Sequence, residues 1–537
     1  MSTGDRVAVL ESQLEDLPEG KPRYESGDVW HNWAHVHGEC RPAVHYYPES
    51  VDDIVAAVKA ASAAKAVLRV AGGGWSPNAA TFTSGHLLHT DQLRRILSID
   101  ERAARVRVQA GATLRELAIA LAARGLEMPV VPSILDPTVG GAIANAAHGT
   151  GLGIKSISGY VRAVTVVDGR GKVHTIDETT PIPATVAALL PPGCPRRLLD
   201  AFACNIGALG IVIDVTLSAQ KLSTVHTVDQ PVRLKEVRSS GDQRAMMNDF
   251  YRVSWTPHTD MCFETVGKFQ RGPDDEVASS VAATVKTSGS ASGIKPHMSS
   301  TQAEEKKLRE AMRALTSPTT QRADLRQWNR ERQTAAFRAA KAVRGPWLRR
   351  DVTEQALAAA CTMPRIQPSV NQTFQRTFLN ERSEAYGAPH EVMPIDCLMK
   401  QHGIEFCVEA KRWRELLDAV VQLIDRERMH VHWPVEVRFI DEEESWLAPN
   451  HGRKSAYVGI VMYRPKGRDP PDWKRYFSAF EDIATRMGGR PHWAKTFSWG
   501  RKDFERSYPC FPAFVQLARL MDPDMVFGNE WLRSLSS

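Results

Sequence analysis

Paired cysteines, long apolar runs and a strong excess of one charge are all missing from this 537-residue chain. Its eight cysteines are scattered without a CxxC pair, which argues against a zinc site or a redox dithiol and favours reduced thiols. No stretch of eighteen uninterrupted apolar residues is present, so no transmembrane helix is predicted. A net charge of +6 is small for this length and gives no reason to expect a nucleic-acid partner.

Targeting signals are also missing at the N-terminus. Glu11, Glu15 and Asp16 follow soon after the first residue, without the apolar core of a signal peptide or the acid-poor composition of a transit peptide. We therefore expect an intracellular protein. Its length predicts two or three domains, and 43% hydrophobic with 24% charged residues is an ordinary globular composition.

Hydrophobic periodicity predicts mixed α and β structure up to about residue 220. Ser50 is expected to cap a helix that begins before Ile54, and Thr113 to cap a second helix that ends at Gly125. Asp168–Gly171 between two apolar runs predicts a hairpin. No G-x-G-x-x-G opens a helix, so the Rossmann dinucleotide fold fits the sequence poorly. Further expected elements are strands at 67–70, 105–109, 161–167, 172–176, 406–409 and 457–462, and a helix at 413–424.

Three glycine-rich segments are the most informative feature of the chain. The first, at 69–77, places three consecutive glycines after an apolar run; the second spans 133–151 and the third 204–212. Successive glycine N–H groups can point into one concavity that holds phosphate oxygens. One such segment alone is equally consistent with a plain turn. Three within about one domain length predict a long cofactor held mostly by main chain.

A basic segment follows a linker-like stretch at 287–294. Residues 301–350 carry thirteen Lys or Arg and five acids, a net +8, so the rest of the chain is slightly acidic. Two interpretations stay open: a solvated helical excursion, with helices at 304–315 and 325–343, or contact with an anionic membrane surface or an acidic partner. Its few aromatics argue against stacking on nucleic-acid bases.

Two C-terminal stretches carry unusual polar chemistry. Glu436 and Arg438 lie two apart in a β-rich run, so their side chains share one face. A carboxylate beside a guanidinium suits a hydroxylated ligand and developing negative charge, although a surface ion pair has the same pattern. In the second stretch His492, Trp493 and Lys495 crowd after Gly-Gly and Pro, where a purely structural loop is the alternative.

Together with Met462–Pro465 and the glycine segments, these motifs resemble the aldonolactone oxidases, which are FAD flavoproteins of the vanillyl-alcohol oxidase type. The resemblance covers about 30–220 and 360–537 and does not include the basic segment. It implies an α+β fold: an N-terminal extension at 1–36, a two-subdomain FAD-binding domain at 37–220, and an α+β substrate (cap) domain at 221–537 with a basic insertion near 280–350. Members oxidise L-gulono-, L-galactono- or D-arabinono-1,4-lactone to ascorbate or an analogue and reduce oxygen to hydrogen peroxide.

The resemblance also implies which residues form the site; it implies no metal. Arg438 and Lys495 would offset negative charge on the substrate oxygen and reduced flavin, and Glu436 would bind lactone hydroxyls, with the identity of the base left open. Ser133 and His492 complete the implied catalytic set. The implied FAD-binding residues are Gly72, Gly73, Gly74, Trp75, Ser76, Pro132, Ser133, Thr138, Gly140, Gly141, Asn145, His148, Gly149, Gly207 and Val212.

Two positions refine this expectation. Trp75 stands where many members carry the histidine that bonds covalently to the flavin, and an indole has no equivalent nucleophilic nitrogen, so we expect non-covalent FAD. At the Pro132 position, oxidases of this group tend to have Gly or Pro and dehydrogenases Ala, which predicts an oxidase. The alternatives are an alditol oxidase, a lactone dehydrogenase with a non-oxygen acceptor, or a membrane- or partner-binding protein with a vestigial flavin site.

Overall fold

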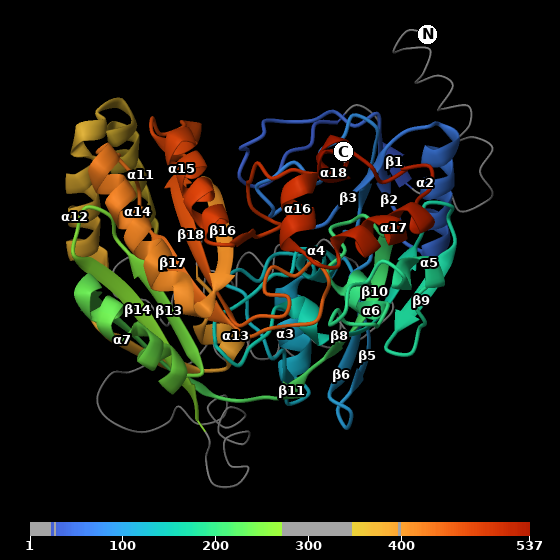
Figure 1. The fold of residues 1–537 in the computed structure, drawn as a ribbon, viewed down its shortest axis with the longest axis horizontal. Helices are drawn as coiled ribbons and strands as arrows, with labels where there is room; N and C mark the ends of the chain where they lie inside the picture. Colours follow the sequence, from blue (N-terminus) through green and yellow to red (C-terminus); the bar gives the residue numbers. More distant parts are fainter. Residues whose placement is uncertain (1–22, 26–27, 271–345, 396–398, 537) are drawn as a thin grey trace, which may run out of the picture.

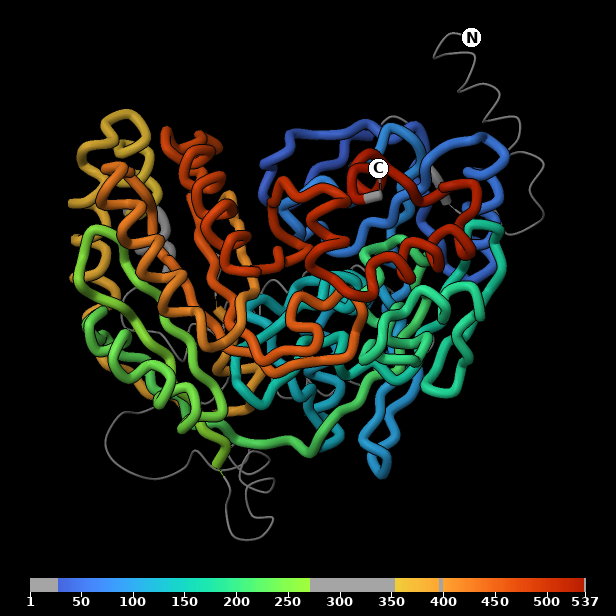
Figure 2. The backbone as a smooth tube through the Cα atoms, in the orientation of Figure 1, coloured from blue at the N-terminus to red at the C-terminus, as the bar shows by residue number. Residues whose placement is uncertain are grey.

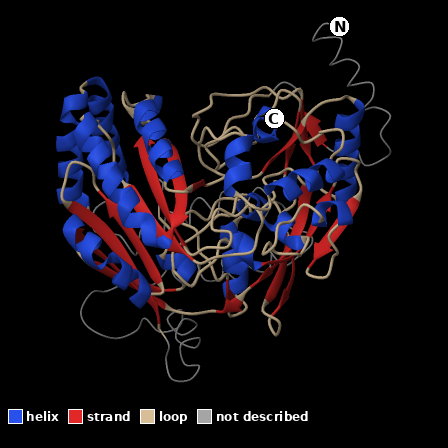
Figure 3. Cartoon of the chain, in the orientation of Figure 1, coloured by secondary structure: helices blue, strands red, loops and turns tan. Residues whose placement is uncertain are grey.

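The computed structural model describes residues 23–25, 28–270, 346–395 and 399–536 (Figure 1). Within these ranges the chain forms a four-stranded, a five-stranded and an eight-stranded sheet, with one additional two-stranded pair. The strands, drawn red in Figure 3, divide along the chain: those of the four- and five-stranded sheets come first, and those of the eight-stranded sheet follow. The strands of the eight-stranded sheet all lie after residue 220.

The four-stranded sheet has the order β1-β2-β4-β3, formed by Arg23–Glu25, Val44–Tyr47, His86–His89 and Leu68–Ala71. Helix α2 (Val51–Ala63) packs on it. As predicted, Ser50 caps this helix: its side chain accepts the Asp53 N–H, and the Asp53 side chain accepts the Ser50 N–H. Ile54 and Val58 are fully buried and share one apolar cluster with Leu68 of β3.

The five-stranded sheet is antiparallel, in the order β5-β6-β10-β8-β9, formed by Ile96–Asp100, Arg105–Gln109, Ile211–Ser218, Val161–Val167 and Val173–Asp177. The predicted hairpin joins β8 to β9, and the Asp168 N–H donates to the Lys172 carbonyl. Helix α3 (Leu114–Ala122) begins after Thr113, which caps it as predicted. The short helix α4 (Val139–Ala144) lies within the second glycine segment.

The eight-stranded sheet is antiparallel throughout and belongs to the cap. Its strands in order are β15 (Ser383–Gly387), β12 (Val225–Arg233), β14 (Met261–Phe269), β13 (Phe250–Trp255), β17 (Val435–Ile440), β18 (Ser455–Tyr463), β16 (Gln401–Glu409) and β19 (Arg490–Pro491). Helices α7 (Leu234–Met247), α14 (Trp413–Glu427) and α15 (Trp473–Arg486) contact it. Trp413 of α14 packs edge-on against Phe439 of β17. Because side chains alternate along a strand, Glu436 and Arg438 face away from α14.

The C-terminal helices return to the first domain. Helices α16 (Arg501–Ser507), α17 (Phe511–Met521) and α18 (Glu530–Ser536) lie beside the early strands (Figure 2). The Leu68 N–H of β3 donates to the Val526 carbonyl at 2.7 Å, and the Gly169 N–H donates to the Met521 carbonyl at 2.9 Å. These bonds join residues after 520, which the sequence assigned to the cap at 221–537, to the first part of the chain.

Most of the basic segment lies outside the described residues, which exclude 271–345. The helices expected at 304–315 and 325–343 therefore stay predictions. The next described element is helix α11 (Pro346–Thr362), which packs on α12 (Gln367–Phe378). Among the described residues, no helix combines the length and apolar character needed to cross a membrane.

Candidate active site

The first glycine loop leaves β3 and lies directly against the second glycine segment. A Cβ on Gly72 would collide with the Thr138 Oγ1, and one on Gly73 would lie 3.1 Å from the Asp136 carbonyl oxygen. Gly74 has a positive φ of 68°, which favours glycine. The N–H groups of Gly73, Gly74 and Trp75 donate to no acceptor within the described chain. Consecutive unused donors fit the diphosphate of FAD.

The other glycines allow main-chain segments to meet. A Cβ on Gly149 would lie 2.6 Å from the Val131 carbonyl oxygen, and one on Gly140 would lie 3.1 Å from that of Ala110. These close approaches fix the path of the second segment. Within it, Thr138 caps α4 by accepting the Gly141 N–H at 3.4 Å, and Asn145 donates to the Gly141 carbonyl at 2.8 Å.

The third segment is held by a buried arginine. Arg69 of β3 donates to the Gly207 carbonyl at 3.2 Å and to the Phe527 carbonyl at 2.7 Å. Gly207 itself has a positive φ of 72°, and Val212 is half-buried on β10. Arg69, which is part of the first glycine segment, therefore joins it to the third segment and to the C-terminal tail.

Strand β17, which carries Glu436 and Arg438, is bonded directly to the second glycine segment. The Gly151 N–H donates to the Phe439 carbonyl at 2.7 Å, and the Phe439 N–H donates to the Thr150 hydroxyl at 3.2 Å. Just beyond the strand, the Asp441 N–H donates to the Ile154 carbonyl at 2.9 Å. These bonds connect the cap strand with the polar pair to the segment expected to run along the cofactor.

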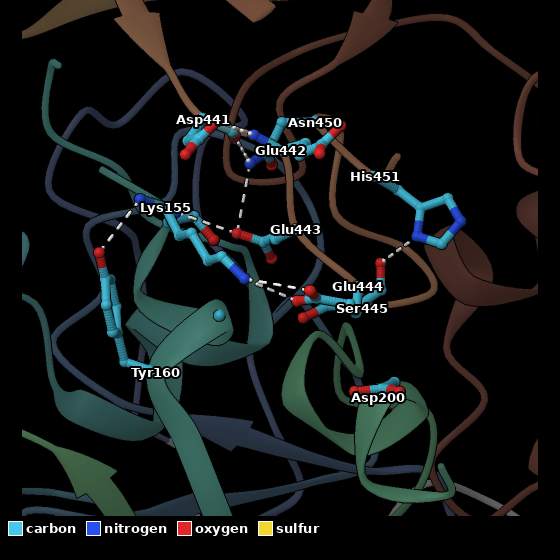
Figure 4. Close-up of polar contacts among 12 residues, drawn as sticks. Lys155, Tyr160, Asp200, Asp441, Glu442, Glu443, Glu444, Ser445, Asn450 and His451 are labelled. Atoms are coloured by element: carbon cyan, nitrogen blue, oxygen red, sulfur yellow. Dashed lines mark hydrogen bonds and ion pairs between the residues drawn. The ribbon is translucent and has the colours of Figure 1, made fainter. Parts of the chain in front are cut away.

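The loop after β17 fixes the same junction (Figure 4). The Ser156 N–H donates to the Glu443 carboxylate at 2.9 Å, and Asn450 donates to the same oxygen at 3.3 Å. Lys155 forms an ion pair with Glu444 at 2.8 Å (Figure 4). Burial raises the pKa of Glu443, although its hydrogen bonds oppose that shift. The cap is thus attached to the first domain at both the strand and its loop.

Glu436 and Arg438 lie on one face of β17, as predicted, and contact each other through Glu436 Oε2 and an Arg438 Nη. A third charged group, Arg252 of the neighbouring strand β13, approaches the other carboxylate oxygen with its Nε at 3.7 Å. The three side chains expose 12–14% of their surface. The pair is therefore a largely buried cluster rather than a surface ion pair.

A second carboxylate, Glu405 of β16, lies in the same cross-strand row as Glu436, with Gly459 between them. His148 of the second glycine segment places its Nε2 3.5 Å from Glu405 and stacks on Tyr457 with ring centroids 3.7 Å apart. Burial alone would raise the pKa of Glu405, but His148, together with Lys495 and Arg438, holds that pKa well below its usual range. Glu405 is therefore ionised.

His492 lies against Glu405, to whose carbonyl its own N–H donates at 2.9 Å. Burial lowers the pKa of His492 to about 3, so the ring is neutral. Its Nδ1 accepts the Ala494 N–H at 3.0 Å, which puts the ring proton on Nε2. His148, Glu405 and His492 lie close enough to hold a metal ion, but that proton leaves His492 without a lone pair for one.

The remaining predicted residues lie on loops that meet this cluster. Lys495 is half-buried, and its stem lies over Gly403 of β16. Asn78, which follows the first glycine loop, donates to the Trp493 carbonyl at 2.5 Å. The Ser133 carbonyl accepts the Ile395 N–H of the cap at 2.8 Å. Trp75 is half-buried, and its ring lies 5.1 Å from that of Trp33.

The sequence interpretation missed Arg252, Glu405 and Tyr457. An acid within the apolar run at 403–408 is itself a signal, because ionisable residues are seldom buried without a partner. Arg252 sits in an alternating strand and has no comparable signal. Only the pairing of strands distant in sequence reveals that these three residues share a face with Arg438.

Two family models match the chain. One, described as D-arabinono-1,4-lactone oxidase, covers residues 297–535, and the other, described as FAD binding domain, covers residues 42–177. These matches relate the chain to the aldonolactone oxidases and to FAD-binding proteins. The first match begins at residue 297 and therefore includes the whole basic segment at 301–350, which the resemblance in sequence had left out. The FAD match includes the first two glycine segments.

Two named relatives that act on gulonolactone are similar over nearly the whole chain. An L-gulonolactone oxidase from Mus musculus is 26% identical over 510 residues, which is 95% of this chain and 98% of that protein. An L-gulono-1,4-lactone dehydrogenase from Mycobacterium tuberculosis is 24% identical over 94% of this chain and 98% of that protein. A cholesterol oxidase structure from Brevibacterium sterolicum shares the fold, with a TM-score of 0.67, 14% identity and coverage of 97% and 98%.

Proposed function

We propose that this protein oxidises the secondary alcohol of a sugar 1,4-lactone, with L-gulono-, L-galactono- and D-arabinono-1,4-lactone as candidate substrates. FAD, when bound, would supply the acceptor for the two electrons, and oxygen would be the final acceptor and would be reduced to hydrogen peroxide. The product is ascorbate or an analogue. The observation that carries the proposal is the docking of the Glu436–Arg438 strand on the second glycine segment through Gly151 and Thr150.

The cluster offers complementary roles to such a substrate. The Glu436 carboxylate accepts hydrogen bonds from lactone hydroxyls. Arg438 and Lys495 offset the negative charge that develops on the substrate oxygen. Neutral His492 is a hydrogen-bond donor through Nε2, and the Ser133 hydroxyl can bond a substrate hydroxyl. The negative charge of Glu405, which also contacts His148, offsets the positive charges of Arg438 and Lys495.

Reduction of the purified flavoprotein tests the substrate class. We expect anaerobic L-gulono-1,4-lactone to bleach the flavin absorbance, because the cluster binds and polarises the lactone alcohol. Glu436→Gln, which keeps the shape but removes the charge, should bleach much more slowly. Bleaching by an alditol but not by any of the three lactones would contradict the proposal and favour an alditol oxidase.

The same preparation tests the electron acceptor. The dehydrogenase name of the relative from Mycobacterium tuberculosis makes a non-oxygen acceptor the second candidate. We expect the bleached wild-type protein to recover its colour in air with release of peroxide. Colour that returns with an artificial dye or cytochrome c, but not in air, would favour the dehydrogenase.

The proposal includes FAD that is not covalently attached, because Trp75 occupies the position of the linking histidine. Acid precipitation should therefore leave the yellow colour in the supernatant. Trp75→His is expected to retain some flavin in the pellet, provided that the substitution preserves the loop geometry. A yellow, fluorescent wild-type pellet would contradict the prediction and point to a different linking residue.

A further inference from the structure

Arg252 lies on the polar face of the cap sheet but belongs to none of the sequence motifs. It is directly opposite Arg438 in the antiparallel pairing of β13 with β17. Glu436 lies beside both: its Oε1 is 3.7 Å from the Arg252 Nε, and its Oε2 contacts an Arg438 Nη. One carboxylate is thus held between two guanidinium groups, one at each oxygen.

This arrangement is a poor solution for stability alone. Like charges directly opposite each other on adjacent strands repel, and burial of charged groups is unfavourable. Burial indeed lowers the pKa of Arg252, and Arg438 adds to that shift while Glu436 opposes it. Well-packed apolar residues at such positions are often as stable as a buried ion cluster, or more so. A second arginine at this site therefore calls for a functional reason.

The Arg252 guanidinium is also held by a hydrogen bond on its side away from Glu436. Its Nη2 donates to the Thr265 hydroxyl at 3.1 Å, and that hydroxyl donates to the Asp229 carboxylate at 2.5 Å. Asp229, Thr265, Arg252 and Arg438 occupy successive opposite positions on β12, β14, β13 and β17. The row holds the Arg252 guanidinium in one orientation against Glu436, so that it limits the movement of the carboxylate.

We propose that Arg252 is a positioning residue for the oxidation: it shares the charge of Glu436 and thereby leaves Arg438 available to the substrate oxygen. This rests on the proposed function, in which Glu436 binds lactone hydroxyls. Arg252, Arg438 and Lys495 against Glu436 and Glu405 sum to +1, and without Arg252 they sum to zero; Asp229 lies behind Arg252, beyond Thr265. Without Arg252, Glu436 would be neutralised by Arg438 alone, and less positive charge would face the developing anion.

Rapid-reaction measurements on the FAD-loaded enzyme test this role. Arg252→Gln should lower the limiting rate of flavin reduction by L-gulono-1,4-lactone about 10- to 100-fold, the range for groups that orient a reactive ligand. The lactone dissociation constant should change less, because Glu436 remains. Arg252→Lys should recover part of the rate, since lysine restores the charge but not the planar guanidinium with its fixed pair of donors.

A matched control is Arg233→Gln, on the exposed end of β12, where the arginine side chain is 56% exposed and pairs with Asp260. The flavin of this variant should be reduced by L-gulono-1,4-lactone at the wild-type rate. The proposal is overturned if Arg252→Gln also reduces at the wild-type rate, or if Arg252→Lys is as slow as Arg252→Gln and both lose melting temperature equally. Those results would make Arg252 a structural residue.

The reduction potential of bound FAD gives a readout that needs no substrate. Loss of a nearby positive charge should make the potential of Arg252→Gln more negative, and Arg252→Lys should return it toward wild type. If no lactone reduces the wild-type enzyme but this shift is present, the proposed substrate fails and the charge role of Arg252 stands. If lactone reduces the wild type while rate and potential of Arg252→Gln are unchanged, Arg252 fails and the proposed function stands.

Discussion

Arg438→Ala is expected to slow flavin reduction by the lactone about 100- to 1,000-fold while FAD stays bound. The guanidinium is proposed to act on charge that appears mainly in the transition state, and loss of a comparable donor costs about 2.7–4 kcal/mol. The fold should survive the change, because Arg252 still approaches Glu436 at 3.7 Å and the carboxylate keeps a cationic partner. Stopped-flow reduction under anaerobic conditions measures the effect, and FAD content and melting temperature check the fold.

Arg438→Lys is the matched variant for this prediction. It keeps the charge and should lie between wild type and Arg438→Ala, because an ammonium cannot contact Glu436 and the substrate oxygen with the same fixed geometry. Unchanged reduction by Arg438→Ala with altered reoxidation in air would contradict the assignment and move Arg438 to the oxygen half-reaction. Loss of FAD from Arg438→Ala would instead make the residue part of the cofactor site.

Short-range sequence patterns predicted the helix starts and the alternation of side chains along a strand, because both depend only on neighbouring residues. Ser50 and Thr113 cap their helices as expected, because a hydroxyl followed three residues later by an acid satisfies the first free N–H groups of a helix. The alternation in 435–440 placed Glu436 and Arg438 on one face, and the structure confirms it. Such signals need no information about distant parts of the chain.

Features that depend on long-range pairing could not be predicted in this way. Arg252 meets Arg438 across 186 positions of sequence because β13 pairs with β17, and no local pattern encodes that pairing. The C-terminal helices were assigned to the cap by proximity in sequence, yet the residues after α17 bond to Leu68 and Arg69 in the first domain. Glu405 joins the site through the cross-strand row that it shares with Glu436 and through His148 of the other domain.

The oxygen reactivity of the reduced enzyme is expected to depend on Pro132. This residue is buried and, with Leu135 and His390, lines a small and mainly apolar cavity of about 20 Å³. Its loop is held on both sides, since Gly149 approaches the Val131 carbonyl and the Ser133 carbonyl accepts the Ile395 N–H. Proline fixes φ and donates no N–H, so it sets the backbone path immediately before Ser133.

Pro132→Ala should therefore slow reoxidation of the reduced flavin by air about tenfold or more, a change of about 1.4 kcal/mol in the barrier. The expected reason is that the backbone path set by proline leaves a passage toward the flavin, which the alanine methyl group would close. Anaerobic reduction by the lactone should be spared, because Glu436, Arg438 and Lys495 are untouched. Mixing the reduced enzyme with aerated buffer, with peroxide release measured in parallel, follows the effect.

Pro132→Gly is the matched comparison, because glycine is the other residue typical of oxidases at this position. It also restores the N–H and frees φ, but it adds no side chain, so its reoxidation should stay close to wild type while Pro132→Ala falls. Equal slowing in both variants would attribute the effect to loop flexibility rather than to a methyl group at the passage. A wild-type reduced flavin that persists in air for minutes, yet transfers electrons readily to a dye, would make the enzyme a dehydrogenase and refute this role for Pro132.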